Sequence, residues 1–265
     1  VGVVRDAVVA WLHEEHKKDP DLGSFFWSLP VVAETYDGFL NDINGFHVKP
    51  EHVFTVLNDA SSGTVAEGNV GGGTGMICHR FMGGIGTASR KLSEDDGDYT
   101  VGVLVQANYG ERKNLTIAGV PVGRELDDLM PVVNTPATDS GGNSIIVVVA
   151  TDAPLLPHQL ERLARRVPLG IARVGGMGAN GTGDICVAFS TANPGAAAKG
   201  AITTLSMLAN DRMTPLFEAT VFATEEAIVN AMVAAETMVG INGNTVYALP
   251  QDRLLDVLRQ YRRLV

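Results

Sequence analysis

Asn143-Ser144-Ile-Ile-Val-Val-Val-Ala-Thr-Asp-Ala-Pro154 is the most strongly patterned stretch of this sequence. The six apolar residues after Ser144 do not alternate with polar ones, which predicts a strand buried on both faces. A polar, glycine-bearing run over residues 138–143 precedes the serine. One serine is therefore expected at the point where a flexible segment enters a buried strand.

This serine has two interpretations. A chain that cleaves itself just before the serine frees a nucleophilic hydroxyl and a new α-amine that can act as its base. The serine can also simply begin a strand, and the stretch alone favours this second interpretation.

Composition sets the class of protein. The chain has 265 residues, of which 45% are hydrophobic, enough for a substantial core in one or two domains. A net charge of −10 and the lack of any long Lys/Arg cluster argue against a nucleic-acid partner. Cys78 and Cys186 lie in apolar or glycine-rich contexts, so we expect free buried thiols and no disulfide framework.

The first residues, Val-Gly-Val-Val-Arg-Asp, are not typical of an initiator sequence and are expected to be the interior of a longer chain. No apolar run approaches the length needed to span a bilayer. The location, cytoplasmic or periplasmic, stays open.

Hydrophobic periodicity predicts a mixture of helices and strands. Helices are expected over residues 1–18, 155–167, 214–239 and 252–264, and strands over 29–38, 51–58, 99–106, 145–150 and 185–189. Their alternation predicts an α/β or α+β fold. His13 and His16 are three residues apart, whereas a helical zinc motif needs four, so no metal site is expected there.

Three small constellations are candidates for chemistry. Glu34 and Tyr36 share one side of a predicted strand and could bind an amine and polarise a carbonyl, or equally form an exposed edge. Asn108 follows a strand, where its amide can donate to an oxyanion but more often caps a turn. Thr182 and Asp184 could orient a nucleophile, although a glycine-rich turn explains them as well.

Residues 68–75 contain five glycines, which let the backbone approach a ligand or another segment closely. Neither the dinucleotide nor the P-loop spacing is met. Packing is the default explanation, and a substrate wall that includes Gly72 and Gly73 is the alternative.

Taken together, several of these pieces resemble one family, the DmpA-type aminopeptidases, which include L-aminopeptidase/D-esterases and β-peptidyl aminopeptidases. The similar pieces lie at residues 30–38, 68–76, 84–89, 106–108 and 143–154, and the resemblance covers nearly the whole chain. It implies an α-β-β-α sandwich, similar to N-terminal nucleophile hydrolases but connected differently.

The resemblance also implies self-cleavage between Asn143 and Ser144. A single catalytic domain, residues 1–265, would then consist of two pieces: residues 1–143, the C-terminal part of the α piece, and residues 144–265, the β piece. The pieces are expected to stay together and to assemble into a homo-oligomer, a tetramer by resemblance.

Residue roles carry over one at a time. Ser144 matches the nucleophile, Asn108 the oxyanion-stabilising asparagine, and Tyr36 a tyrosine beside the reacting carbonyl. Glu34 matches the carboxylate that receives the free amine of the substrate. Thr182 and Asp184 match the element that supports the nucleophile, with Thr182 in place of the serine of better-known β-peptidyl members. No metal or cofactor is implied.

The sequence thus predicts a self-processing serine aminopeptidase (peptidase family S58) acting on short peptides, amides or esters with a free amine. One rival is an acyltransferase of the ornithine acetyltransferase type, which cleaves before a threonine and is therefore disfavoured by Ser144. The other is an inactive scaffold or binding homologue.

Overall fold

The computed structural model describes residues 1–134, 144–197 and 202–264. They form two compact units. Unit 1 contains residues 1–34 and 42–65, and unit 2 contains residues 35–41 and 66–265. The single catalytic domain stays a prediction. No helix among the described residues is both long and apolar enough to cross a membrane.

Unit 1 is built from two helices that pack against each other, α1 (Gly2–Lys17) and α2 (Pro50–Asn58). Trp11 Nε1 donates to Asn58 Oδ1 at 2.8 Å and joins them. The helix predicted over residues 1–18 is confirmed, but the strand predicted over 51–58 is wrong. Pro50 at the helix start and Glu51 in the first turn favour a helix over the β-branched residues that follow.

The strand predicted over residues 29–38 is also wrong, because these residues have no regular secondary structure before the turn at Gly38. The range is divided between the units after Glu34. A strand needs a hydrogen-bonded neighbour, and no described strand pairs with this range.

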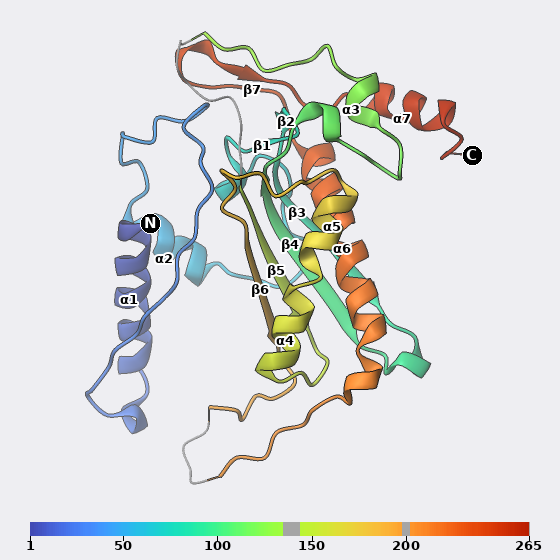
Figure 1. Cartoon of the computed structure of the whole chain (residues 1–265). Helices are drawn as coiled ribbons and strands as arrows, with labels where there is room; N and C mark the ends of the chain where they lie inside the picture. Colours follow the sequence, from blue (N-terminus) through green and yellow to red (C-terminus); the bar gives the residue numbers. More distant parts are fainter. Residues whose placement is uncertain (135–143, 198–201, 265) are drawn as a thin grey trace. The chain divides into compact units, whose positions relative to one another are not determined.

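Unit 2 is organised around a four-stranded sheet in the order β3-β4-β5-β6 (Figure 1). The strands are β3 (Gly84–Lys91), β4 (Thr100–Asn108), β5 (Ser144–Thr151) and β6 (Ile185–Ser190). The first two pairings are antiparallel, and β5 and β6 run parallel. Two short hairpins join β1 (Ile77–Cys78) to β2 (Phe81–Met82) and β7 (Met238–Val239) to β8 (Thr245–Val246).

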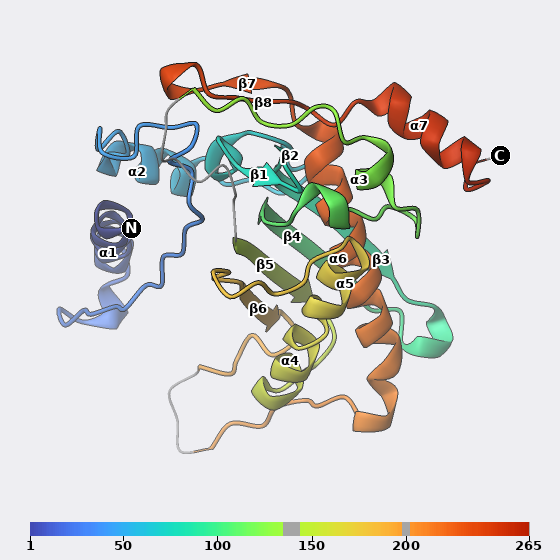
Figure 2. The ribbon, with the colours of Figure 1, turned by 45° about the horizontal axis from the view of Figure 1, so that its top comes forward.

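Helices cover one face of this sheet (Figure 2). The long helix α6 (Thr214–Ala234) packs on β3 and β4, α5 (Val167–Arg173) on α6, and α4 (Pro157–Ala164) on β6 and α6. The remaining helices are α3 (Val122–Glu125) and α7 (Gln251–Gln260). Short 3₁₀ turns lie at Pro20–Leu22, Gly71–Gly73, Glu94–Asp96, Arg112–Asn114, Asn210–Arg212 and Ile241–Gly243.

Two predicted helices differ in their extent. The helix expected over 155–167 is split into α4 and α5, because Pro168 lacks an N–H and is accommodated only at the start of a new helix. The helix expected over 214–239 ends at Ala234, since Ala235 is extended and leads into β7.

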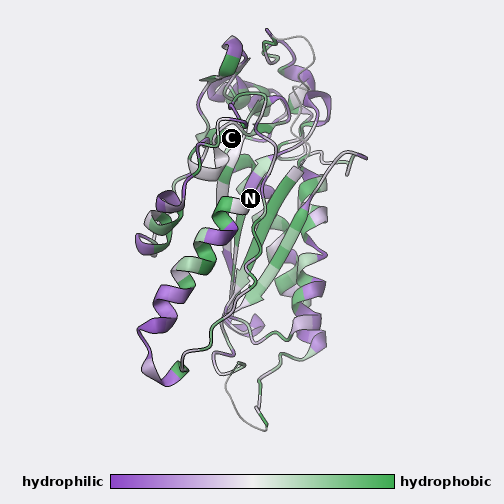
Figure 3. Ribbon diagram, turned by 90° about the vertical axis from the view of Figure 1, so that its left-hand side faces the viewer, coloured by the Kyte–Doolittle hydropathy of each residue, from purple (hydrophilic) through white to green (hydrophobic). Residues whose placement is uncertain are grey.

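The core lies between the sheet and α6. Alternate residues of β4 and β5 are buried in the same cluster as the inner side of α6. The other residues of β5 are only half-buried. The prediction that this strand is buried on both faces is therefore wrong. The predicted burial of β6 is wrong as well: this edge strand leaves Val187 49% and Phe189 46% exposed. Figure 3 shows hydrophobic residues along the strands.

Gly86 permits the closest approach between β3 and α6. A Cβ at this position would lie 2.0 Å from the carbonyl oxygen of Ala227 and 2.6 Å from the amide nitrogen of Ala231. Both are backbone atoms of a long helix, so they cannot move aside as a flexible side chain would.

We therefore expect Gly86→Ala to lower the free energy of unfolding by about 1–3 kcal/mol, the usual cost of overpacking a well-packed site. Gly102→Ala is the matched control, because a Cβ on this residue of the neighbouring strand β4 would meet nothing within 4 Å. Urea unfolding of the two variants measures the difference. Equal stabilities would refute the close approach of β3 to α6.

A buried polar cluster holds the β1–β2 hairpin. Its turn places His79 and Arg80 at φ 49° and 65°. His79 Nδ1 lies 3.1 Å from the carbonyl oxygen of Glu111, and the His79 backbone N–H donates to the carbonyl of Tyr109 at 2.7 Å. Arg112 donates to four carbonyls, including that of His79 at 3.0 Å. Burial lowers the pKa of His79 to about 4, so its ring is neutral at pH 7.

This depressed pKa predicts a pH-dependent stability. The unfolded histidine, with a pKa of 6.5, binds a proton before the folded one does, so its contribution is complete above that pH and is lost as the pH falls toward about 4. The loss is about 3 kcal/mol. His79→Asn keeps a residue that tolerates positive φ but cannot titrate in this window. Unfolding at pH 7.5 and pH 4.5 should show a smaller pH effect in this variant, and an equal effect would refute the assignment.

Candidate active site

The pairing of β4 with β5 brings the two central candidates together. Ser144 is the first residue of β5 and Asn108 is the last of β4, and the antiparallel register places them directly opposite each other. Residues in this relation have Cα atoms about 4.5–5.5 Å apart. The nucleophile and the oxyanion-binding amide predicted from sequence are therefore neighbours.

Asn108 is held rigidly. Its side chain is fully buried, its Oδ1 accepts from the Ile77 N–H at 2.7 Å, and its Nδ2 donates to the Tyr36 carbonyl at 2.8 Å. These two bonds fix which end of the amide is the donor. An amide nitrogen carries two hydrogens, and no second described residue accepts from this one. The second N–H thus has no acceptor among the described residues, and its predicted donation to an oxyanion stays a prediction.

The segment before β6 supports the start of β5. Ser144 Oγ accepts from the Gly183 N–H at 3.2 Å. Asp184 Oδ1 accepts from the Ile145 N–H at 3.2 Å and from Thr182 Oγ1 at 2.6 Å. The parallel pairing of Ile146 with Ile185 explains this geometry, since it sets Asp184 beside Ile145.

Among the described residues, only the Gly183 N–H is hydrogen-bonded to Ser144 Oγ. In the described part of the chain, no histidine, lysine or carboxylate is hydrogen-bonded to this hydroxyl and so placed to take its proton. This geometry is compatible with the predicted use of the α-amine of Ser144 as the base after cleavage, and that role stays a prediction. Asn143, the other half of the predicted cleavage site, lies outside the described residues.

Tyr36 contributes its backbone to the site through the bond from Asn108. The tyrosine is 45% exposed as a residue, and its phenol lies over Gly38, where a Cβ would be 2.6 Å from the hydroxyl oxygen. The predicted place of this hydroxyl beside a reacting carbonyl stays a prediction. Glu34 is exposed and belongs to unit 1, so its role as an amine-binding carboxylate also stays a prediction.

Close packing accounts for the two glycines predicted to bind substrate. A Cβ on Gly72 would lie 2.5 Å from Gln106 Oε1, and a Cβ on Gly73 would lie 2.5 Å from the carbonyl oxygen of Gly68. Gln106 in turn donates to Thr35 Oγ1 at 2.7 Å. A contact between these glycines and substrate stays a prediction.

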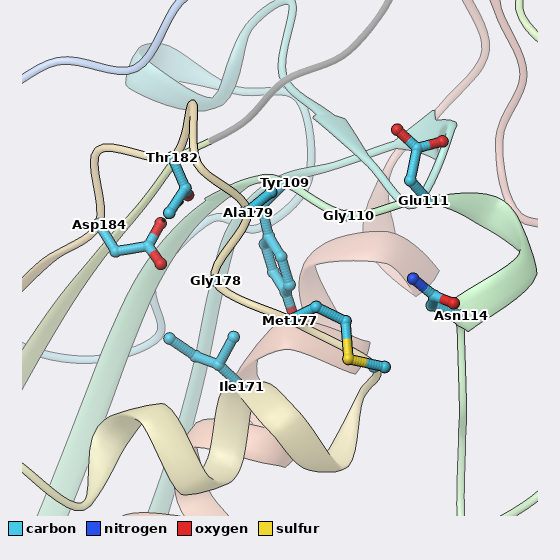
Figure 4. A pocket seen from close by; sticks show the side chains of 11 residues that line it. Tyr109, Gly110, Glu111, Asn114, Ile171, Met177, Gly178, Ala179, Thr182 and Asp184 are labelled. Carbon is cyan, nitrogen blue, oxygen red and sulfur yellow. Dashed lines mark hydrogen bonds between the residues drawn. The ribbon is translucent and has the colours of Figure 1, made fainter.

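Thr182 and Asp184 also line a pocket of about 80 Å³ (Figure 4). Tyr109, Ile171 and Met177 form part of its wall. Tyr109 was not among the residues predicted from the sequence. Its position directly after Asn108, at the end of a strand, was the available signal.

Both cysteines are free, as predicted, but only Cys78 is buried as expected, since Cys186 is half-buried; neither is suited to act as a nucleophile. Burial raises the pKa of Cys78 to about 12 and that of Cys186 to about 11, so both remain thiols at neutral pH. Within the described ranges, no cluster of three or more His, Cys, Asp or Glu residues is arranged to hold a metal ion.

Comparison with known proteins places this site in a family. The model of peptidase family S58 matches residues 1–246. The chain belongs to peptidase family S58. It is 54% identical to beta-peptidyl aminopeptidase BapA of Sphingosinicella microcystinivorans, over 100% of this chain and 68% of the relative. The predicted family is confirmed, and with it the enzyme class, a hydrolase.

Two solved structures share the fold of this chain. The Ochrobactrum anthropi l-aminopeptidase d-ala-esterase/amidase is 48% identical with a TM-score of 0.89, covering 100% of this chain and 72% of that one. A Burkholderia sp. beta-aminopeptidase is 52% identical with a TM-score of 0.86, covering 98% and 71%. The former is described as a variant of the Ntn hydrolase fold, which confirms the predicted fold class.

The hydrogen bond from Thr182 Oγ1 to Asp184 is predicted to affect the rate of turnover. Thr182→Val keeps the shape but removes the hydroxyl, so Asp184 loses its 2.6 Å partner and is freer to leave the Ile145 N–H. A hydrogen bond to a charged group contributes about 1.5–3 kcal/mol, so we expect kcat to fall about 10- to 100-fold. Thr182→Ser, which restores the donor, should recover most of the rate. Kinetics on an aminoacyl p-nitroanilide test this, and wild-type turnover by the valine variant would contradict it.

Proposed function

We propose that this protein is a self-processing serine aminopeptidase that hydrolyses N-terminal residues from short peptides, amides or esters through an acyl-enzyme on Ser144. One observation carries the proposal: Ser144 begins β5 directly opposite Asn108, with Gly183 bonded to its hydroxyl and no described side chain bonded there as a base. Membership of family S58 and the names of the relatives support it.

Self-cleavage is the first step. Ser144 Oγ attacks the carbonyl carbon of Asn143, the peptide nitrogen leaves with a proton as the new α-amine, and water then hydrolyses the resulting ester. The products are a carboxyl group on Asn143 and a free N-terminus on Ser144.

The new amine then serves as the base in catalysis. It takes the proton of Ser144 Oγ as the oxygen attacks the substrate carbonyl, and it gives the proton to the leaving amine. The free N–H of Asn108 Nδ2 stabilises the tetrahedral oxyanion, typically by about 3–4 kcal/mol. Water enters next, and the same base activates it to release the acyl group.

Asp184 and Thr182 position the nucleophile in this scheme. Through its bond to the Ile145 N–H, Asp184 fixes the residue that follows the N-terminal serine, and it places a negative charge near the protonated amine. Thr182 fixes Asp184. Tyr36, Gly72 and Gly73 would form the walls around the scissile group.

Glu34 supplies the choice of substrate in this proposal. A carboxylate that pairs with the free ammonium of the substrate makes the enzyme an aminopeptidase and excludes internal peptide bonds. Assembly into a homo-oligomer of cleaved pairs is part of the same proposal. The acyltransferase alternative is disfavoured by Ser144, since that type uses threonine, and the comparisons bring no support for it.

The proposal predicts a strict need for both the hydroxyl and the free amine. With the full-length protein, alanine amide should be hydrolysed, its N-acetylated counterpart should not, and Ser144→Ala should abolish turnover. Thr182→Ser is a matched control that keeps the same hydroxyl chemistry near the site. Hydrolysis of both amides at similar rates would contradict the need for a free amine. Hydrolysis by Ser144→Ala would contradict the role of Ser144 as the nucleophile. If the wild-type protein shows no turnover, the alternative of an inactive scaffold or binding homologue would be favoured.

A further inference from the structure

The pocket behind the Thr182–Asp184 segment has no assigned role in the scheme above. Gly183 faces Ser144, since its N–H is bonded to Oγ and a Cβ on it would lie 3.3 Å from that atom. The side chains of Thr182 and Asp184 line the pocket, whereas Ser144 does not. The pocket is therefore lined by the two residues that flank Gly183, the residue whose N–H is bonded to Ser144 Oγ.

Tyr109 gives this pocket a polar group without a partner. The tyrosine is only 5% exposed, and its hydroxyl is buried with no hydrogen-bond partner among the described residues. Figure 4 shows its ring pointing into the group of lining residues, toward Met177. The ring packs edge-on against His79, with centroids 5.1 Å apart, and Gly176 leaves room for it.

A buried hydroxyl without a partner is costly, so a group of this kind is expected to meet one. Burial raises the pKa of Tyr109 well above its ordinary value, and Cys78 and Asp184 act in the same direction. The phenol is therefore neutral at pH 7 and retains a proton to donate.

We propose that this pocket binds the side chain of the residue whose carbonyl is attacked, and that the Tyr109 hydroxyl donates a hydrogen bond to a neutral oxygen of that side chain. The inference rests on the proposed function and specifies its substrate class: small residues with a hydroxyl or amide group, favoured over apolar residues of the same size.

Size and charge limit the class further. A cavity of about 150 Å³ holds a benzene molecule, so one of about 80 Å³ holds a side chain of roughly three or four non-hydrogen atoms. Asp184 on the wall disfavours an acidic side chain, and Glu111, also on the wall, is neutralised by Arg80 at 2.7 Å. Ile171 and Met177 provide apolar contacts for the aliphatic part.

Threonine and valine are the matched substrate pair, because they have the same shape and differ by one hydroxyl. Their p-nitroanilides, or the corresponding β-amino-acid derivatives if only those are hydrolysed, are compared with the full-length enzyme. We expect kcat/KM to be about 5-fold higher for the threonine substrate, and Tyr109→Phe to bring that ratio close to one, mainly through KM. Tyr247→Phe, which removes a hydroxyl outside the pocket, should leave the ratio unchanged.

A second variant tests the pocket itself. Ala179→Leu fills part of its volume and should reduce turnover of both substrates relative to that of the glycine p-nitroanilide. An unchanged threonine-to-valine ratio in Tyr109→Phe, or unchanged relative rates in Ala179→Leu, would overturn the pocket assignment while leaving the aminopeptidase intact. Failure of the wild type to hydrolyse any of the three substrates would overturn both.

Discussion

The antiparallel register of β4 and β5 is the constraint on which the site depends. It sets Asn108 opposite Ser144 at the ends of two central strands, with Val103 and Val149 on the same ladder in the core. A slip of one residue would turn every side chain of β5 to the other face, so the burial of its alternate residues in the core cluster that includes α6 fixes the register. The energy that holds Ser144, the proposed nucleophile, in place is thus largely hydrophobic and comes from core residues away from Ser144.

Each polar contact at the site then follows from the position of a strand end. Asn108 can bond both Ile77 and Tyr36 because the hairpin at β1 and the turn after Tyr36 lie beside the end of β4. Asp184 reaches Ile145 because β6 runs parallel to β5. The backbone N–H of Gly183 donates to Ser144 Oγ, and the backbone N–H of Ile145 donates to Asp184. These bonds fix the position of Ser144 in a site that has few ionisable side chains.

The sequence predicted the central part of this arrangement well. An uninterrupted apolar run identified β5, and the end of β4 and the Thr182–Asp184 spacing were identified without structural information. These signals are local, since they depend on strand composition and on residues two apart. The family resemblance then supplied the residue roles, which stay predictions, whereas the resemblance itself is confirmed by membership of family S58.

Other predictions failed because they depended on tertiary context. Residues 51–58 have β-branched side chains, but Pro50 starts a helix there. The apolar run of β6 was expected to be buried, yet its place at the edge of the sheet leaves Phe189 46% exposed. Tyr109 was missed because an unpartnered buried hydroxyl is visible only once the neighbouring residues are placed.

The central claim is that Ser144 becomes an N-terminal nucleophile. Its most direct test is an intact mass of the purified full-length protein under denaturing conditions, with N-terminal sequencing of each species. Two chains, the second beginning at Ser144, are expected, and Ser144→Ala should remain a single chain. A single uncut chain in a wild-type preparation that hydrolyses substrate would contradict the account, because the hydroxyl would then need a different base.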